Sequence, residues 1–129
     1  MELTHFLLDT GPQRVAPFSH AFRAGNFLFV TGQMPTALDD NTRCVEGGVE
    51  AQLDQVIANL RMVVAGCGGD WRRVAMARIY LTEFARDYPL VNAAWEGYFH
   101  PGQLPARTTV GVTALALGAL IEVDLIVAS

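Results

Sequence analysis

The sequence of 129 residues contains no lysine, and all nine of its basic residues are arginine. A chain without lysine cannot form a Schiff base with pyridoxal phosphate or with a carbonyl substrate. It also lacks the lysine that binds phosphates in a P-loop. Covalent imine chemistry by the protein is therefore excluded, whereas imine chemistry on a free substrate remains open.

Cysteine is scarce too, because Cys44 and Cys67 are the only two. Two cysteines are too few for a disulfide framework, so a reducing cytosol is the expected compartment. The first residues lack the basic start of a secretion signal. No apolar run reaches the roughly 18–20 residues of a membrane span, so we expect a cytoplasmic protein without a membrane partner.

The formal net charge is −4, and the arginines form no basic cluster. An acidic chain of this kind is unsuited to a general nucleic-acid surface, so no nucleic-acid partner is expected. The histidines and cysteines show no metal-ligand spacing, and we therefore predict no metal site. The glycines at positions 66, 68 and 69 follow a helical segment, which indicates a helix end instead of a phosphate cradle.

Apolar residues, by contrast, are abundant. They make up 51% of the chain while charged residues make up 17%. The length predicts one domain over residues 1–129. A single domain of this size has limited interior in which to hide apolar surface, so the surplus favours burial between subunits.

Two segments have the periodicity of helices. From about Val49 to Val64, apolar residues recur at spacings of three and four and form one stripe. A second helix is expected from about Tyr88 to Phe99, with Pro89 tolerated in its first turn.

The remaining regular segments read as strands. Residues 24–26 form a plausible hairpin turn, and residues 36–47 read as a polar loop. In the last strand, alternate apolar residues point one way while Glu122 and Asp124 point the other. The expected strands are Glu2–Asp9, His20–Arg23, Phe27–Thr31, Val74–Leu81, Thr108–Thr113 and Leu120–Val127.

This order of elements predicts an α+β fold. Two helices would cover one face of a mixed, mostly antiparallel sheet of about six strands. The other face would still need cover, and in so apolar a chain another copy of the same chain is the expected cover.

Arg107 and Glu122 are the candidate chemical groups. Arg107 stands where a loop stiffened by Pro105 enters a strand, and its guanidinium can hold a carboxylate through two parallel hydrogen bonds. The alternative is a surface arginine or an ion pair within the subunit. Glu122 lies either on a solvated sheet face or in a cleft that raises its pKa. If both groups met in one pocket, one could hold the substrate while the other moved protons.

Five collinear segments resemble the Rid (YjgF) family over nearly the whole chain, from about residue 14 to residue 128. No single segment is specific, but their order and spacing are. The segments are Ala16–Ala21 (APFSHA), Val30–Pro35 (VTGQMP), Val91–Glu96 (VNAAWE), Leu104–Thr109 (LPARTT) and Ile121–Asp124 (IEVD).

The resemblance implies a chorismate-mutase-like fold that forms a homotrimeric barrel with helices outside and pockets between subunits. It also implies a hydrolase that needs no cofactor. The implied activity is deamination of reactive enamines and imines, of the 2-aminoacrylate and 2-iminopropanoate type, to 2-keto acids and ammonia.

The family's substrate-clamping arginine falls on Arg107, and its acidic residue falls on Glu122. Its pocket glycine and asparagine fall on Gly32 and Asn92, with Thr31 where a hydroxyl residue is usual.

Two further pocket positions depart from the family pattern. Phe18 stands where many deaminating members have tyrosine, and Thr109 where some have cysteine. These departures predict an altered substrate preference. Two alternatives stay open, namely a dedicated pathway enzyme for a related imine or carbonyl substrate and a non-catalytic trimer that binds small carboxylates.

Overall fold

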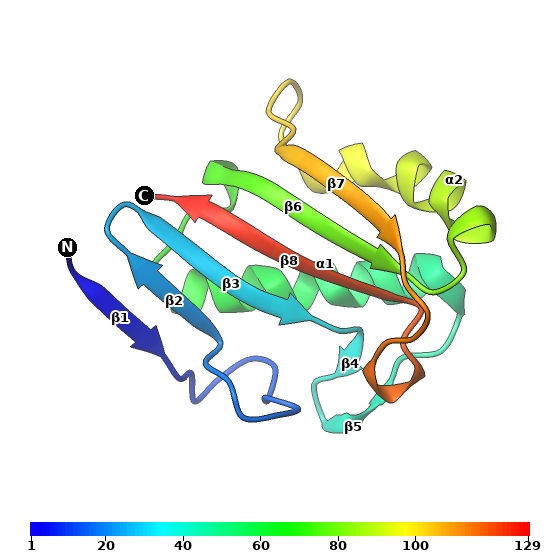
Figure 1. The fold of residues 1–129 in the computed structure, drawn as a ribbon, viewed down its shortest axis with the longest axis horizontal. Coiled ribbons are helices and arrows are strands. Elements are labelled where there is room, and N and C mark those ends of the chain that lie inside the picture. Colours follow the sequence, from blue (N-terminus) through cyan, green and yellow to red (C-terminus); the bar gives the residue numbers. More distant parts are fainter.

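A computed structural model describes all residues from Met1 to Ser129. Six strands form one sheet in the order β1-β2-β3-β8-β6-β7, and only the β6–β7 pair is parallel. Both helices lie behind this sheet in Figure 1. The bounds are β1 Leu3–Phe6, β2 Ala21–Ala24, β3 Phe27–Gln33, β4 Thr36–Ala37, β5 Asp40–Cys44, α1 Gly48–Gly66, β6 Val74–Leu81, α2 Phe84–Trp95, β7 Ala106–Gly111 and β8 Ile121–Ala128.

The predicted α+β architecture is confirmed, and α1 and β8 follow their sequence patterns closely. The apolar stripe of α1 is buried, and the helix ends where Gly68 takes a left-handed φ of 75°. In β8 the residues alternate between buried and half-buried. The buried ones, Ile121, Val123, Leu125 and Val127, pack in the core against α1.

Helix α2 begins earlier than predicted. It starts at Phe84, because the Asp87 amide already donates to the Glu83 carbonyl at 2.9 Å, and Pro89 therefore lies in the second turn. Proline there has no N–H for the Ala85 carbonyl, so the helix lacks one backbone hydrogen bond. The helix also ends at Trp95, short of Phe99, and a 3-10 turn follows at Glu96–Tyr98.

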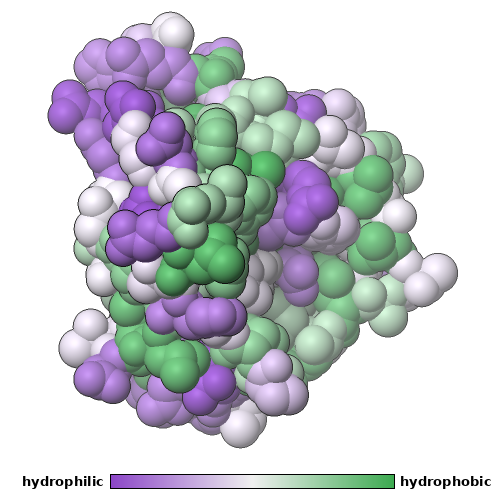
Figure 2. Space-filling model, turned by 60° about the vertical axis from the view of Figure 1, so that its left-hand side comes forward, coloured by the Kyte–Doolittle hydropathy of each residue, from purple (hydrophilic) through white to green (hydrophobic).

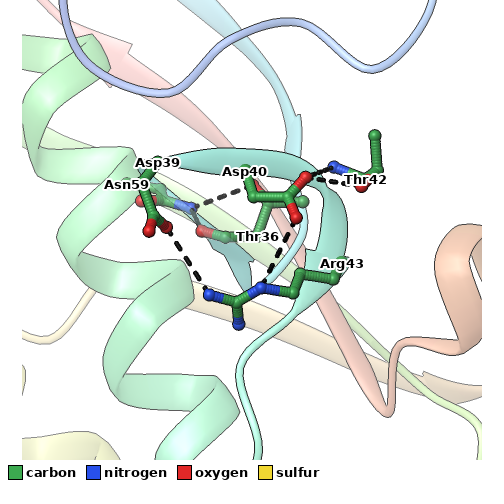
Figure 3. Close-up of polar contacts among 6 residues, drawn as sticks. All are labelled: Thr36, Asp39, Asp40, Thr42, Arg43 and Asn59. Carbon is green, nitrogen blue, oxygen red and sulfur yellow. Dashed lines mark hydrogen bonds and ion pairs between the residues drawn. The ribbon is translucent and has the colours of Figure 1, made fainter.

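The polar loop expected at residues 36–47 contains the β4–β5 hairpin, so that prediction was wrong (Figure 3). Asp40 accepts hydrogen bonds from the Thr42 amide at 3.0 Å and from the Thr42 hydroxyl, which order the start of β5 just after the turn. Buried Asn59 of α1 donates to the Thr36 carbonyl at 3.1 Å. Side-chain contacts thus order a segment whose composition suggested a loop.

The sheet face away from the helices has no cover within the chain. Cross-strand pairing places Phe22, Phe29 and Ile126 in one row on this face. Phe29 is 45% exposed and Phe27 is 48% exposed. Figure 2 likewise shows hydrophobic patches among polar residues on the side of the molecule that it presents. The uncovered sheet face expected from the sequence is therefore present.

Neither α1 nor α2 combines the length and the apolar character that a membrane-spanning helix requires.

Candidate functional site

Arg107 lies on the edge strand β7, which starts two residues earlier than predicted and so includes it. Its Nη2 atom donates to Asn92 Oδ1 at 2.5 Å. The guanidinium also lies over two aromatic rings of α2, 5.8 Å from the Tyr88 centroid and 5.6 Å from the Trp95 centroid. We call Arg107, Asn92, Tyr88, Trp95 and Thr109 the arginine cluster.

No carboxylate of the chain forms an ion pair with Arg107. An amide and two aromatic rings orient the guanidinium but leave its charge uncompensated. Several of its N–H donors remain available in the planar arrangement that fits a carboxylate. The arginine cluster is therefore equipped to bind an anion.

Thr109 lies two residues after Arg107 on the same face of β7, since they pair with Ile79 and Ala77 of β6. Its hydroxyl oxygen is buried and has no hydrogen-bond partner. A buried hydroxyl without a partner destabilises the fold, and such groups are rare in native structures.

Glu122 is half-buried on β8 and closely contacts Gly32 of β3. A Cβ atom at Gly32 would overlap the Glu122 Oε2 atom and approach its Cδ to 3.0 Å, so a larger residue there would displace the Glu122 carboxyl. A register shift between Val30 and Gln33 places Gly32 in an irregular part of the β3–β8 pair. Burial raises the pKa of Glu122, and the negative charge of Asp124 raises it further.

Residues just before β2 lie near Glu122 and Gly32 and belong to the same group of side chains. The Thr31 hydroxyl donates to the Ser19 carbonyl at 2.6 Å. Phe18, next to Ser19, lines a small pocket together with Gly32. We call Glu122, Gly32, Thr31 and Phe18 the glutamate cluster.

His20 fixes the loop that carries Phe18. Its Nδ1 atom accepts the Leu8 amide at 3.1 Å, so Nε2 carries the proton that is donated to the Pro12 carbonyl at 2.8 Å. The residue is buried, and its ring therefore ties the first part of the loop to the residue that precedes β2.

The two clusters lie on opposite faces of the sheet. Arg107 pairs with Ala77 of β6, whereas Glu122 pairs with Tyr80 of the same strand. Residues three apart on a strand point to opposite faces. One chain therefore brings Arg107 to Asn92 and Thr109, and Glu122 to Gly32, but it does not bring Arg107 to Glu122.

Tyr88 and Trp95 were not among the site residues expected from the sequence. Trp95 is buried in the core, and it also contacts Arg107. Tyr88, Asn92 and Trp95 are spaced by four and three residues, which places them on one face of α2. That spacing is the sequence signal that identifies them.

No group of three or more His, Cys, Asp or Glu side chains is arranged to hold a metal ion. The chemistry available to the two clusters is anion binding at Arg107 and proton transfer at Glu122.

The chain is thus an α+β protein with two helices on one face of a mostly antiparallel sheet of six strands. A family model described as endoribonuclease L-PSP matches residues 9–129. Protein DfrA of Myxococcus xanthus is 40% identical over 124 residues, covering 94% of this chain and 92% of that protein. The 2-iminobutanoate/2-iminopropanoate deaminase of Dermatophagoides farinae is 31% identical over 116 residues, covering 90% and 88%.

The crystal structure of YyfA from Yersinia pestis, a protein of the Rid family, matches with a TM-score of 0.90 at 29% identity. The match covers 99% of this chain and 100% of that chain. The chain belongs to the Rid (YjgF) family.

Proposed function

We propose that this protein is a cofactor-independent deaminase that hydrolyses reactive enamines and imines to 2-keto acids and ammonia. The observation that carries the proposal is the guanidinium of Arg107, which forms no ion pair within the chain and is oriented by Asn92. The Dermatophagoides farinae relative, named as a 2-iminobutanoate/2-iminopropanoate deaminase, supports the same chemistry.

The proposed assembly is a homotrimeric barrel, the arrangement that the family resemblance implies. The uncovered sheet face would lie inside the barrel, where burial of Phe22, Phe29 and Ile126 favours association. Each pocket would combine the arginine cluster of one subunit with the glutamate cluster of its neighbour. This arrangement is supported by the opposite orientations of Arg107 and Glu122 within one chain.

In the proposed reaction, 2-aminoacrylate first tautomerises as a proton moves from its nitrogen to its terminal carbon. Arg107 would bind the carboxylate of the resulting 2-iminopropanoate and orient the imine carbon. Water adds to the C=N bond, and the C–N bond then breaks to release ammonia and pyruvate. The overall balance is one enamine and one water to one keto acid and one ammonia.

Glu122 would handle the protons of this sequence. As a carboxylate it accepts a proton from the attacking water, and as a carboxylic acid it returns that proton to the departing nitrogen. Its raised pKa suits both roles, because a carboxyl with a higher pKa is a stronger base and is more readily reprotonated near neutral pH. Gly32 leaves the space that this carboxyl occupies.

A dedicated enzyme for a related imine or carbonyl substrate is the second candidate. It is favoured by Phe18, a ring without the hydroxyl group of the tyrosine that many members of the family have at this position. Thr109 also favours it, because it has a hydroxyl where some members have the thiol of cysteine. Such an enzyme would use the same clusters on a narrower set of substrates.

The test generates 2-aminoacrylate in situ and follows its loss with wild type, Arg107→Ala and Glu122→Gln. We expect Arg107→Ala to weaken pyruvate binding at least about tenfold, because charged hydrogen bonds are lost. Glu122→Gln should still bind pyruvate but turn over about a hundredfold more slowly or worse. The matched control is Arg72→Ala, which removes an exposed arginine paired with Asp70.

Full activity of Arg107→Ala would refute the assigned site. Pyruvate binding without any acceleration by the wild type would instead identify a non-catalytic carboxylate-binding protein.

A further inference from the structure

Arg14 is a second unpaired arginine beside the proposed site. It lies in the loop before β2, and its Nη1 atom donates to the Phe18 carbonyl at 3.1 Å. The Asn41 side chain of β5 donates to the Arg14 carbonyl at 2.9 Å, which ties the backbone of Arg14 to the hairpin. One hydrogen bond thus holds the Arg14 side chain at Phe18, and the other holds its backbone at the hairpin.

The small pocket that contains Phe18 and Gly32 also contains Arg14. Its other lining residues are uncharged, namely Gln13, Val15, Gln33, Met34 and Thr36. No carboxylate forms an ion pair with Arg14. The pocket therefore carries one positive charge that nothing in the chain neutralises.

The position of this charge relative to Glu122 gives it a chemical meaning. Gly32 lies against the Glu122 carboxyl and also lines the pocket that contains Arg14. A substrate whose imine carbon faces Glu122 would therefore direct its side chain along Gly32 toward Phe18 and Arg14. Phe18 adds a ring but no hydrogen-bonding group, so the guanidinium is the charged group available to a polar side chain there.

We propose that Arg14 binds a second carboxylate, so that the preferred substrates are imines of dicarboxylic amino acids such as 2-iminosuccinate and 2-iminoglutarate. The inference rests on the proposed function, because Arg107 must hold the first carboxylate. The two arginines would then bind the two ends of the substrate, with the imine carbon beside Glu122. An exposed ion pair of this kind changes affinity by about fivefold at most, so the expected preference for dicarboxylates over monocarboxylates is about fivefold.

The experiment separates binding from turnover. Binding of 2-oxoglutarate and of 2-oxobutanoate, which are products with two carboxylates and one, is measured by calorimetry for wild type, Arg14→Gln and Arg14→Lys. Arg14→Gln keeps a donor for the Phe18 carbonyl but removes the charge, whereas Arg14→Lys keeps the charge. Arg72→Gln removes the same charge near Asp70, on a 3-10 turn outside the site.

We expect wild type, Arg14→Lys and Arg72→Gln to bind 2-oxoglutarate about fivefold more tightly than 2-oxobutanoate. In Arg14→Gln this preference should disappear while binding of 2-oxobutanoate is unchanged. Rates of hydrolysis of 2-iminosuccinate and 2-iminopropanoate, each generated by an amino-acid oxidase, should show the same pattern in kcat/KM.

The outcomes distinguish the two proposals. If wild type and Arg14→Gln both turn over 2-iminopropanoate and show the same preference for dicarboxylates over monocarboxylates, the role of Arg14 is overturned. The proposed deaminase activity then stands. Absence of any keto-acid binding by the wild type overturns both.

Discussion

Mixing two inactive variants tests directly how the site is assembled. Arg107→Ala lacks the carboxylate clamp but keeps Glu122, and Glu122→Gln lacks the proton-transfer group but keeps Arg107. These side chains point to opposite faces of the sheet, so the proposed site takes them from two different subunits. Two variants that each lack one group can then still form a complete site together. A site between subunits requires only an intact arginine from one copy and an intact glutamate from its neighbour.

The expected recovery of deaminase activity follows from the fraction of complete sites in the mixture. In a random equimolar mixture, half of the arginine donors and half of the glutamate donors are intact, so about one quarter of the sites are complete. The fraction does not depend on the number of subunits in the ring. We therefore expect about 25% of wild-type deaminase activity after the two variants are unfolded and refolded together.

A second mixture provides the control, with wild type and the Arg107→Ala/Glu122→Gln double variant in equal amounts. A shared site again gives about one quarter of the activity, whereas a site within one subunit gives about one half. Native mass spectrometry verifies that mixed oligomers have formed. Mixed oligomers that stay inactive in the first mixture and half-active in the second would refute the reasoning from sheet faces.

Two further substitutions probe individual groups. Glu122→Gln should raise the Tm at neutral pH, because the folded protein, with its raised Glu122 pKa, holds the proton more tightly than the unfolded chain. Glu122 thus lowers stability as pH rises through its folded pKa, and the gain in Tm should vanish in acid; a gain that persists there contradicts this. Thr109→Val should stabilise the fold by about 1 kcal/mol in urea unfolding, since it removes the buried unsatisfied hydroxyl. The same variant should bind pyruvate more weakly, and unchanged affinity would remove Thr109 from the site.

The sequence was sufficient for features that depend on local periodicity. The spacing of apolar residues predicted α1, and alternation in β8 predicted that Glu122 and Asp124 share the face opposite Ile121 and Val123. Five collinear segments were enough for the family resemblance, which the family model confirms. In each case the signal lies within a few neighbouring residues or in their order along the chain.

Features that depend on contacts between distant segments were missed. The β4–β5 hairpin is polar in composition, and Asn59, on a helix that follows it in sequence, helps to hold it. The start of α2 at Phe84 was missed because Pro89 suggested a later first turn. Tyr88 was missed because its contact with Arg107 depends on how α2 lies relative to β7 in the folded chain.

Arg107 and Glu122 were identified from the sequence, but how they are arranged relative to each other could be learned only from the structure. Alternation along β8 fixes the face of Glu122, because the same strand must bury Ile121 and Val123. Arg107 is on a separate strand, and its face is decided by its pairing with Ala77 across β6. Only the register of both pairs reveals that the strand pattern that builds the core also separates the two groups. Within one chain the two groups stay apart, so the proposed activity, which uses both, is expected only when a second copy of the chain supplies the missing group.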